Sequence, residues 1–136
     1  MGDEAVLMVE TELPVAFKCA NATGIAKGAV CKLTESMTAI IGSGAKDALA
    51  GIAAAEKIAS DGNVTIPIYM AGIFKVTAVA AILIGAPISL SATANRFQTA
   101  TGSNGATIAG YALEAPSGNG QTFLAMIRIG TGGELA

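Results

Sequence analysis

Short hydrophobic runs, separated by turns rich in glycine, asparagine and serine, recur along most of this chain. Alternation of hydrophobic and polar positions is typical of a β-strand with one buried face. The expected strands are Val15–Cys19, Ala29–Leu33, Thr38–Ile41, Val64–Ala78, Ile88–Leu90, Arg96–Ala100, Thr107–Glu114 and Thr122–Ile129. So many short strands predict an all-β, mainly β fold, either a small β-barrel or a β-sandwich.

Two of these strands carry more detailed predictions. In "VTIPIYMAGIFKVTA", Val64–Ala78, Pro67 predicts an edge strand or a bulge, because proline cannot donate a ladder hydrogen bond. Gly72 predicts a bend in the same strand. In Ile88–Leu90 the two hydrophobic residues alternate with serines, so we expect Ser89 on a solvent-facing side.

The segment Ala45–Ala59, "AKDALAGIAAAEKIA", has the composition of a helix. Leu49 and Ile52 recur at a helical spacing, although Gly51 costs about 1 kcal/mol in a helix interior. A strand over Leu49–Ala54 is the alternative. The pattern therefore leaves open whether one short helix is inserted in the β domain.

The chain ends in a predicted hairpin, in which Thr107–Glu114 and Thr122–Ile129 are joined by Ala115–Gln121. Glu114 could pair with Arg128 across it, and we expect that carboxylate to have no catalytic role. A loop is expected at Gly102–Gly105. For the whole chain we expect an extended N-terminal arm at 1–14, a single β domain at 15–130 and a flexible tail at 131–136.

The composition favours a protein that works in an assembly. Charged residues are 13% and aromatic residues 4% of the chain, while hydrophobic residues are 52%, many of them alanine. A surface with so few charges tends to be covered by a partner, so we prefer an assembly to an alanine-rich monomer. The net charge of −2, with no basic cluster, excludes nucleic acid as an expected partner.

Neither the cysteines nor the apolar runs suggest a secreted or membrane protein. Cys19 and Cys31 are expected as two buried free thiols, with a disulfide as the alternative. The apolar stretch Val76–Ile88 is too short to span a bilayer, so no membrane partner is expected. The N-terminus is acidic, unlike a secretory signal, and we expect synthesis in the host cytoplasm.

A search for reactive groups gives no catalytic, cofactor-binding or metal-binding residue. The chain has no histidine, which excludes a histidine-based triad, and no ligand set that suits zinc. "GSGAK" at Gly42–Lys46 lacks the full spacing of a phosphate-binding loop and predicts a flexible turn. We therefore expect no cofactor and no enzyme activity.

Three stretches resemble a known family. They are "GIAKGAVCKL" near the start, "VTIPIYMAGIFKV" in the middle, and "GAPISLSATANRFQTA" followed by "IAGYALEAPSGNGQTFLAMIRI" at the end. Their order and pattern resemble those of phage capsid decoration proteins, also called cement or head-stabilising proteins. The similarity runs from Val15 to Ile129 and depends on the pattern of residues, not on reactive groups.

The resemblance implies a structural virion protein on the outer surface of an icosahedral phage head, bound to the major capsid protein. Members are commonly homotrimers, with homodimers as the alternative, and many use an N-terminal arm to reach a neighbouring capsid subunit. The candidate contact residues are Leu7, Met8, Val9, Glu10, Glu12 and Leu13. Leu7, Met8 and Val9 could add a strand to a capsid edge or pack on this protein's own barrel.

Two other functions stay open at this point. A glycan-binding or tail-spike-type surface domain would also be a β module, although such sites usually present exposed aromatic residues, and only Tyr69, Tyr111 and four phenylalanines are available. The other is an accessory domain of an enzyme, which a catalytic activity lost on mutating Glu114 would favour.

Overall fold

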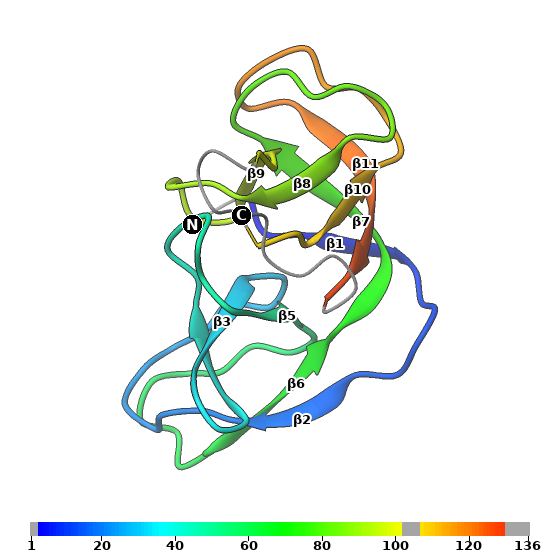
Figure 1. The fold of residues 1–136 in the computed structure, drawn as a ribbon. Helices are drawn as coiled ribbons and strands as arrows, with labels where there is room; N and C mark the ends of the chain where they lie inside the picture. The colour runs from blue at the N-terminus through cyan, green and yellow to red at the C-terminus, as the bar shows by residue number, and fades with distance from the viewer. Residues whose placement is uncertain (1–2, 102–106, 130–136) are drawn as a thin grey trace.

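The computed structural model describes residues 3–101 and 107–129, and every regular element in these ranges is a β-strand (Figure 1). The strands are β1 (Val6–Val9), β2 (Val15–Lys18), β3 (Val30–Glu35), β4 (Thr38–Ile41), β5 (Leu49–Ala53), β6 (Thr65–Tyr69), β7 (Ala71–Ala78), β8 (Pro87–Leu90), β9 (Arg96–Thr99), β10 (Gly110–Ala112) and β11 (Thr122–Arg128). The predicted all-β fold is confirmed. The expected loop Gly102–Gly105 and tail 131–136 lie outside the described residues, and the division into arm, domain and tail stays a prediction.

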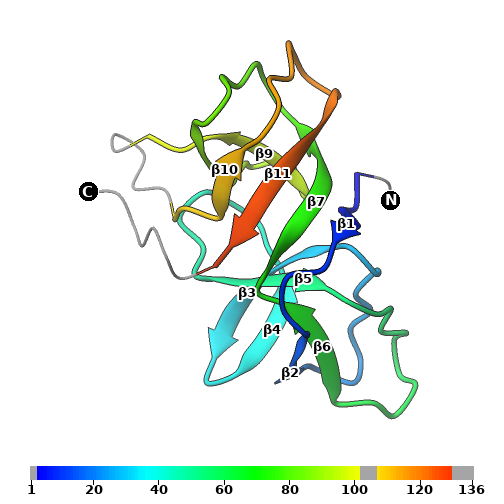
Figure 2. The same ribbon diagram turned by 90° about the vertical axis from the view of Figure 1, so that its right-hand side faces the viewer.

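Two closed barrels, each of five strands, lie one above the other in Figure 1. The N-terminal barrel has the order β2-β4-β3-β5-β6, and the C-terminal barrel has the order β7-β11-β10-β8-β9. Most neighbouring strands are antiparallel, and each barrel contains one parallel pairing, β2 with β4 and β7 with β9. β1 belongs to neither closed ring. It pairs with β7, which Figure 2 shows between β1 and β11.

One residue, Met70, separates β6 from β7, so the predicted strand Val64–Ala78 passes from one barrel into the other. The chain bends at Met70, two residues before the position that Gly72 suggested. Ile66 and Ile68 are buried, as their alternation predicts.

The predicted edge or bulge at Pro67 is wrong, because β6 pairs with β2 on one side and β5 on the other, with no shift of register. The Pro67 carbonyl accepts a hydrogen bond from the N–H of Ala54. In a strand, the N–H and C=O groups of one residue point to the same neighbour. The nitrogen of Pro67 therefore faces Ala54, one residue beyond the end of β5, so the bond that proline cannot donate falls at the end of that strand.

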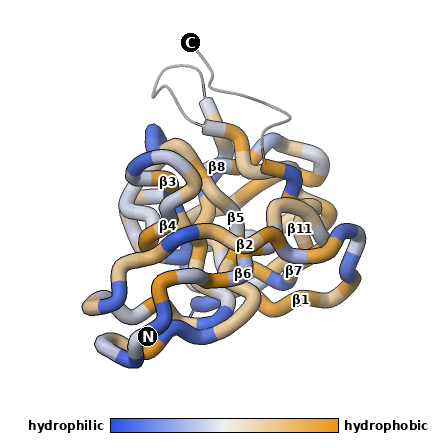
Figure 3. The backbone as a smooth tube through the Cα atoms, turned by 90° about the horizontal axis from the view of Figure 1, so that it is seen from below, coloured by the Kyte–Doolittle hydropathy of each residue, from blue (hydrophilic) through white to orange (hydrophobic). Residues whose placement is uncertain are grey.

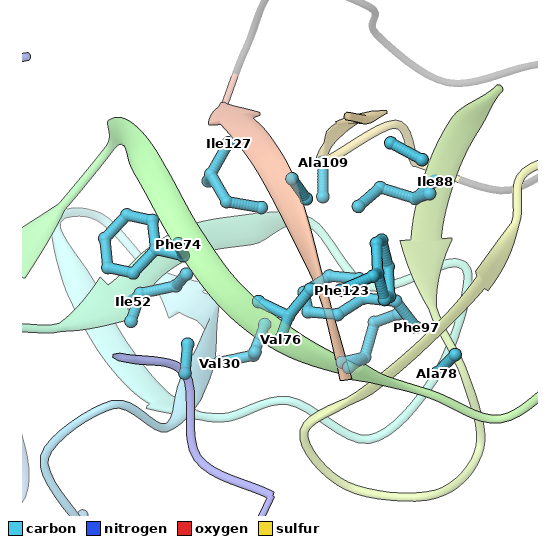
Figure 4. Packing of buried hydrophobic residues seen from close by; sticks show 14 of the residues in the cluster. Val30, Ile52, Phe74, Val76, Ala78, Ile88, Phe97, Ala109, Phe123 and Ile127 are labelled. Carbon is cyan, nitrogen blue, oxygen red and sulfur yellow. The ribbon is translucent and has the colours of Figure 1, made fainter. Parts of the chain in front are cut away.

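The two barrels share one large hydrophobic cluster. Its three phenylalanines, Phe74, Phe97 and Phe123, belong to the C-terminal barrel, and Val30 and Ile52 join it from the N-terminal barrel (Figure 4). A second cluster fills the N-terminal barrel, and it is formed by Phe17, Cys19, Ile25, Ala29, Cys31, Ala39, Ala50, Ala53, Ile66 and Ile68. Because the larger cluster spans both barrels, each barrel covers apolar surface of the other.

β5 settles the question of Ala45–Ala59 in favour of a strand, and the described residues contain no helix. Leu49 and Ile52 join the shared cluster, whereas Ala50 and Ala53 join the cluster inside the N-terminal barrel. The pairing of β5 with β3 shifts register beside Gly51, and such a bulge inserts one extra residue. The bulge turns the strand period of two into the spacing of three that suggests a helix.

The predicted solvent face of β8 is also wrong, because Ser89 and Ser91 are both buried. Ser91 satisfies its hydroxyl locally, since its Oγ lies 3.0 Å from the Thr93 carbonyl oxygen and 3.1 Å from the Thr93 amide nitrogen. The remaining hairpins agree with the sequence. β8 pairs antiparallel with β9, and β10 pairs antiparallel with β11.

Candidate functional site

The N-terminal arm, which carries all the candidate contact residues, is anchored to the barrels at several points. At its start, Arg96 donates from Nε to the Asp3 carboxylate at 2.8 Å. Nη1 of the same guanidinium donates to Oδ1 of Asn119 at 2.7 Å. Arg96 therefore joins the arm to the loop between β10 and β11, although 93 residues separate it from Asp3.

A second anchor joins the arm to the N-terminal barrel. The N–H of Ala5 donates to the Gly28 carbonyl at 2.8 Å. Gly28 has a φ of +88°, which strongly favours glycine, and a Cβ at this position would stand 2.3 Å from the carbonyl oxygen of Ala5. Only glycine allows the two backbones to approach this closely.

β1 itself pairs antiparallel with β7, with Val6 opposite Lys75 and Leu7 opposite Phe74. Leu7 also packs against the shared cluster. Within residues 3–101 and 107–129 only β7 pairs with β1, so the other edge of β1 is open. The sequence allowed Leu7, Met8 and Val9 either to add a strand to a capsid edge or to pack on the protein's own barrel. In the isolated chain they lie on the protein's own barrel.

A third anchor follows β1. The hydroxyl of Tyr69 donates to Oε2 of Glu10 at 3.0 Å, and this bond is the main reason that the pKa of Tyr69 is raised. The ring of Tyr69 packs edge-on against Phe74, with ring centroids 5.8 Å apart. Residues 10–14 then lead to β2 in the N-terminal barrel, so the arm bridges the two barrels.

Most of the candidate contact residues expose apolar surface. Met8 is 53% exposed, Val9 51% and Leu13 77%, while Leu7 is half-buried. Glu10 and Glu12 are exposed and flank this apolar stretch with negative charge. The arm thus presents an open strand edge together with side chains that a partner could cover.

A cleft of about 530 Å³ lies beside β1, between the arm and the N-terminal barrel. Its lining includes Leu7, Gly28, Ile52, Tyr69 and Phe74, with Glu4 and Lys27 as its charged groups. No catalytic arrangement is found among these lining residues.

The sequence predicts an arm, but it does not reveal the residues that position this segment in the structure: Gly28, Tyr69 and Arg96. Gly28 lies within the quoted motif "GIAKGAVCKL", yet its role depends on Ala5, which is distant in sequence. Arg96 enters the sequence analysis only as the first residue of a predicted strand. No local pattern could have shown these contacts, because each joins segments from different parts of the chain.

Elsewhere in the described residues, the side chains that could take part in chemistry have structural roles. The sequence suggested that Glu114 could pair with Arg128 across the hairpin, but the structure does not place them together. Oε1 of Glu114 accepts the N–H of Leu124 at 2.9 Å, while the N–H of Arg128 donates to Ala109 at the other end of the hairpin. The carboxylate of Asp47 accepts the N–H of Gly44 at 2.8 Å, which holds "GSGAK" as the expected turn.

A buried lysine, Lys57, stabilises the loop between β5 and β6. Lys57 is 3% exposed, and its Nζ donates to the carbonyls of Asn21 and Ile58 and to Oδ1 of Asp61, at 2.7 to 2.8 Å. The hydrogen bond from Lys57 lowers the pKa of Asp61 to about 2. All three protons of the ammonium group are therefore satisfied, which suits a structural clamp.

Both cysteines are buried and free, as predicted. Burial raises the pKa of Cys31 to about 12, and burial also raises that of Cys19. Among the described residues no group of three or more acidic or cysteine side chains is arranged to hold a metal ion. The same residues contain no helix with the length and apolarity needed to cross a membrane.

Comparison with known proteins identifies a family that the chain matches. The family model described as "phage cement protein" matches residues 9–127, from the last residue of β1 to near the end of β11. No curated protein matches the chain. The match covers both barrels and includes Val9, Glu10, Glu12 and Leu13 of the arm, whereas Leu7 and Met8 precede it.

Proposed function

Because the chain belongs to the phage cement protein family, whose members are structural proteins that stabilise the capsid, we propose that it binds the outer surface of an icosahedral head. Its binding partner there is the major capsid protein, and its action is to hold neighbouring capsid subunits together. It is made in the host cytoplasm and acts as part of the virion, without catalysis and without a cofactor.

The open edge of β1 is the observation that carries this proposal. An exposed strand edge offers unpaired N–H and C=O groups, which bind an extended segment of another protein by adding it to the sheet. The exposed side chains of Met8, Val9 and Leu13 lie along and just beyond this strand. We therefore propose Leu7, Met8, Val9, Glu10, Glu12 and Leu13 as the capsid contact.

The anchors of the arm make this edge a prepared binding surface. Asp3, Ala5 and Glu10 are each held by a hydrogen bond to one of the barrels. An edge that is already ordered loses less conformational entropy when a partner binds than a flexible arm would. This differs from a loose arm that becomes ordered only on the capsid.

Stabilisation follows from binding one state of the shell. A protein that binds only the expanded lattice stabilises it by about 2.7 kcal/mol per site when its free concentration is a hundredfold above its dissociation constant. A multimer that contacts several subunits adds avidity to each contact. We propose a homotrimer, with a homodimer as the alternative.

The glycan-binding or tail-spike alternative gains no support from the family match or from the described surface. Of the two tyrosines, Tyr69 is bonded to Glu10, and Tyr111 is exposed on strand β10. We therefore pursue the cement function alone.

The test uses heads that lack this protein, prepared before and after expansion. Deleting residues 1–13 would also remove Ala5 and Leu7 from the shared cluster, so exposed point variants give a cleaner result. We expect the Met8→Asp, Leu13→Asp double variant to lose cosedimentation with expanded heads. The control, Val64→Asp, changes a 57% exposed valine on the N-terminal barrel and should bind normally. Equal binding by both variants would rule out the arm as the contact.

A further inference from the structure

The outward side of β10, β11 and β7 forms a continuous apolar face. Neighbouring strands place Tyr111 beside Met126 and Met126 beside Ile73. In the next row the backbone N–H of Leu113 donates a hydrogen bond to the Leu124 carbonyl, and Leu124 lies opposite Lys75. We call these six residues the β10–β11–β7 face: Ile73, Lys75, Tyr111, Leu113, Leu124 and Met126.

This face is exposed although its strands are well packed on the other side. Phe123, Ala125 and Ile127 alternate along β11 with the outward residues and are fully buried. On the outward side Tyr111 is 46% and Leu113 36% exposed, and the other apolar members are half-buried. Val6 and Val9 extend the apolar surface onto β1, which Figure 3 shows in hydrophobic colour beside β7.

Two opposite charges lie on the two sides of β11. Lys75 is exposed on β7, between Val6 and Leu124, and forms no salt bridge with any residue that the structure describes. Glu114 is exposed at the end of β10, where its carboxylate accepts the N–H of Leu124. The row through Leu124 therefore has a cation on one flank, an anion on the other and apolar side chains between them. Arg128, exposed two positions beyond Met126 on the same side of β11, adds a second cation at the far end of the face.

We infer that a second copy of this chain covers the β10–β11–β7 face, with Lys75 of one copy beside Glu114 of the next. Opposite charges on opposite flanks make the face complementary to itself. A closed ring brings the cationic flank of one copy against the anionic flank of the next, whereas a two-fold contact with its axis along β11 would also bring Arg128 of the two copies together. This inference rests on the proposed self-association and assigns its surface.

The open edge of β1 is a poorer candidate for the same contact. Its apolar residues lie between Glu4 and Glu10. Two copies of β1 paired antiparallel about Leu7 would bring Glu4 of each copy opposite Glu10 of the other, and like charges in this position are destabilising. Self-association through the sheet face therefore leaves the β1 edge available for the capsid.

The test measures the mass of the purified full chain by light scattering and native mass spectrometry, with no heads present. We expect the unmodified protein to be a multimer. Lys75→Glu and Glu114→Lys should each weaken association by at least about tenfold, while the double variant with both changes should recover it because the trans pairs are restored with reversed sign. A monomeric unmodified protein, or a double variant as weak as the single variants, would overturn the inference.

Two further variants keep the result clear if a charge reversal disturbs folding. Lys75→Gln and Glu114→Gln remove charge with little change in shape, and each should weaken association less than the corresponding reversal. Val64→Asp, on the N-terminal barrel, should leave the mass unchanged, and circular dichroism checks the fold of each variant. If the neutral variants associate as tightly as the unmodified protein, the charge pairing is wrong. Head binding is measured separately, so failure of the cement function would appear as a multimer that does not bind heads.

Discussion

Ala5 and Gly28 meet backbone to backbone, with the N–H of Ala5 2.8 Å from the Gly28 carbonyl oxygen. This contact joins the arm to the N-terminal barrel, while β1 joins it to the C-terminal barrel. The arm is therefore part of the folded unit, and the residue that makes this possible is a glycine with a positive φ.

Gly28→Ala should detach the start of the arm. A residue with a side chain in this backbone conformation costs about 1–2 kcal/mol, and its Cβ would also clash with the Ala5 carbonyl. Gly62→Ala is a matched control, because Gly62 has the same φ of +88° but no atom within 4 Å of the added Cβ. We expect Gly28→Ala to lose more stability than the control and to lose hydrogen-exchange protection at Ala5. Equal stability with a protected arm would contradict this role.

Asn95 should be important for the contact between the barrels. It is buried with a φ of 66°, and its Oδ1 accepts the N–H of Val30 at 2.9 Å. Asn95→Ala leaves that N–H unsatisfied and strains the backbone, so we expect a loss of about 2–4 kcal/mol in chemical denaturation. Asn95→Gly removes the bond without the strain and should lose less. A reversed order would show that backbone strain at this position does not add to the cost of the alanine variant, and a loss near zero for both variants would show that the side-chain bond contributes little.

Lys57→Met should be strongly destabilising even though it replaces a charge with an apolar side chain. Its Nζ donates to two carbonyls and to Asp61, and each acceptor would lose that hydrogen bond and keep only a backbone N–H donor. Asp61 is exposed and its charge stays solvated, so the loss comes from the hydrogen bonds of the buried ammonium group. Lys46→Met, at an exposed position, is the control and should change the free energy of unfolding little. A small loss for Lys57→Met would mean that the clamp contributes little.

The same clamp predicts a pH dependence. The pKa of Asp61 is lowered from 3.8 to about 2 in the folded protein, so the folded state favours the ionised carboxylate. Its contribution to stability is present above the unfolded pKa and is lost as the pH falls from about 4 towards 2. Asp61→Asn should therefore flatten the stability profile in this window. A variant with the same slope as the unmodified protein would assign the acid sensitivity to other groups.

The thiols should be unreactive until the protein unfolds. Burial raises the pKa of Cys31 to about 12, so almost no thiolate forms at pH 8, and Cys19 is also buried. We expect maleimide labelling of the native protein to be slow at both sites and rapid in denaturant. Rapid labelling of native Cys31 would show that the N-terminal barrel opens readily.

The sequence pattern was sufficient for the strands whose residues alternate regularly, such as β6, where Ile66 and Ile68 are buried. It left β5 open between helix and strand, because a bulge beside Gly51 changes which face each later residue occupies. It failed at β8, where Ser89 is buried despite its polarity. Burial depends on what covers a strand, which the strand's own residues do not specify.

The arm was predicted from composition, since an apolar stretch flanked by acids is visible in one segment. Its anchors were not, because Arg96, Tyr69 and Gly28 each contact the arm from a distant part of the chain. The failed pairing of Glu114 with Arg128 has a similar cause. The hairpin register, with Gly110 opposite Ile127, places them at opposite ends of the ladder.

The central claim is that this protein binds the expanded phage head through the open edge of β1. Electron microscopy of expanded heads mixed with the purified protein tests it most directly. We expect extra density at regular positions on the outer surface, with β1 against an extended capsid segment, and no such density on unexpanded heads. Expanded heads that remain bare at a protein concentration well above that of the capsid subunits would contradict the claim.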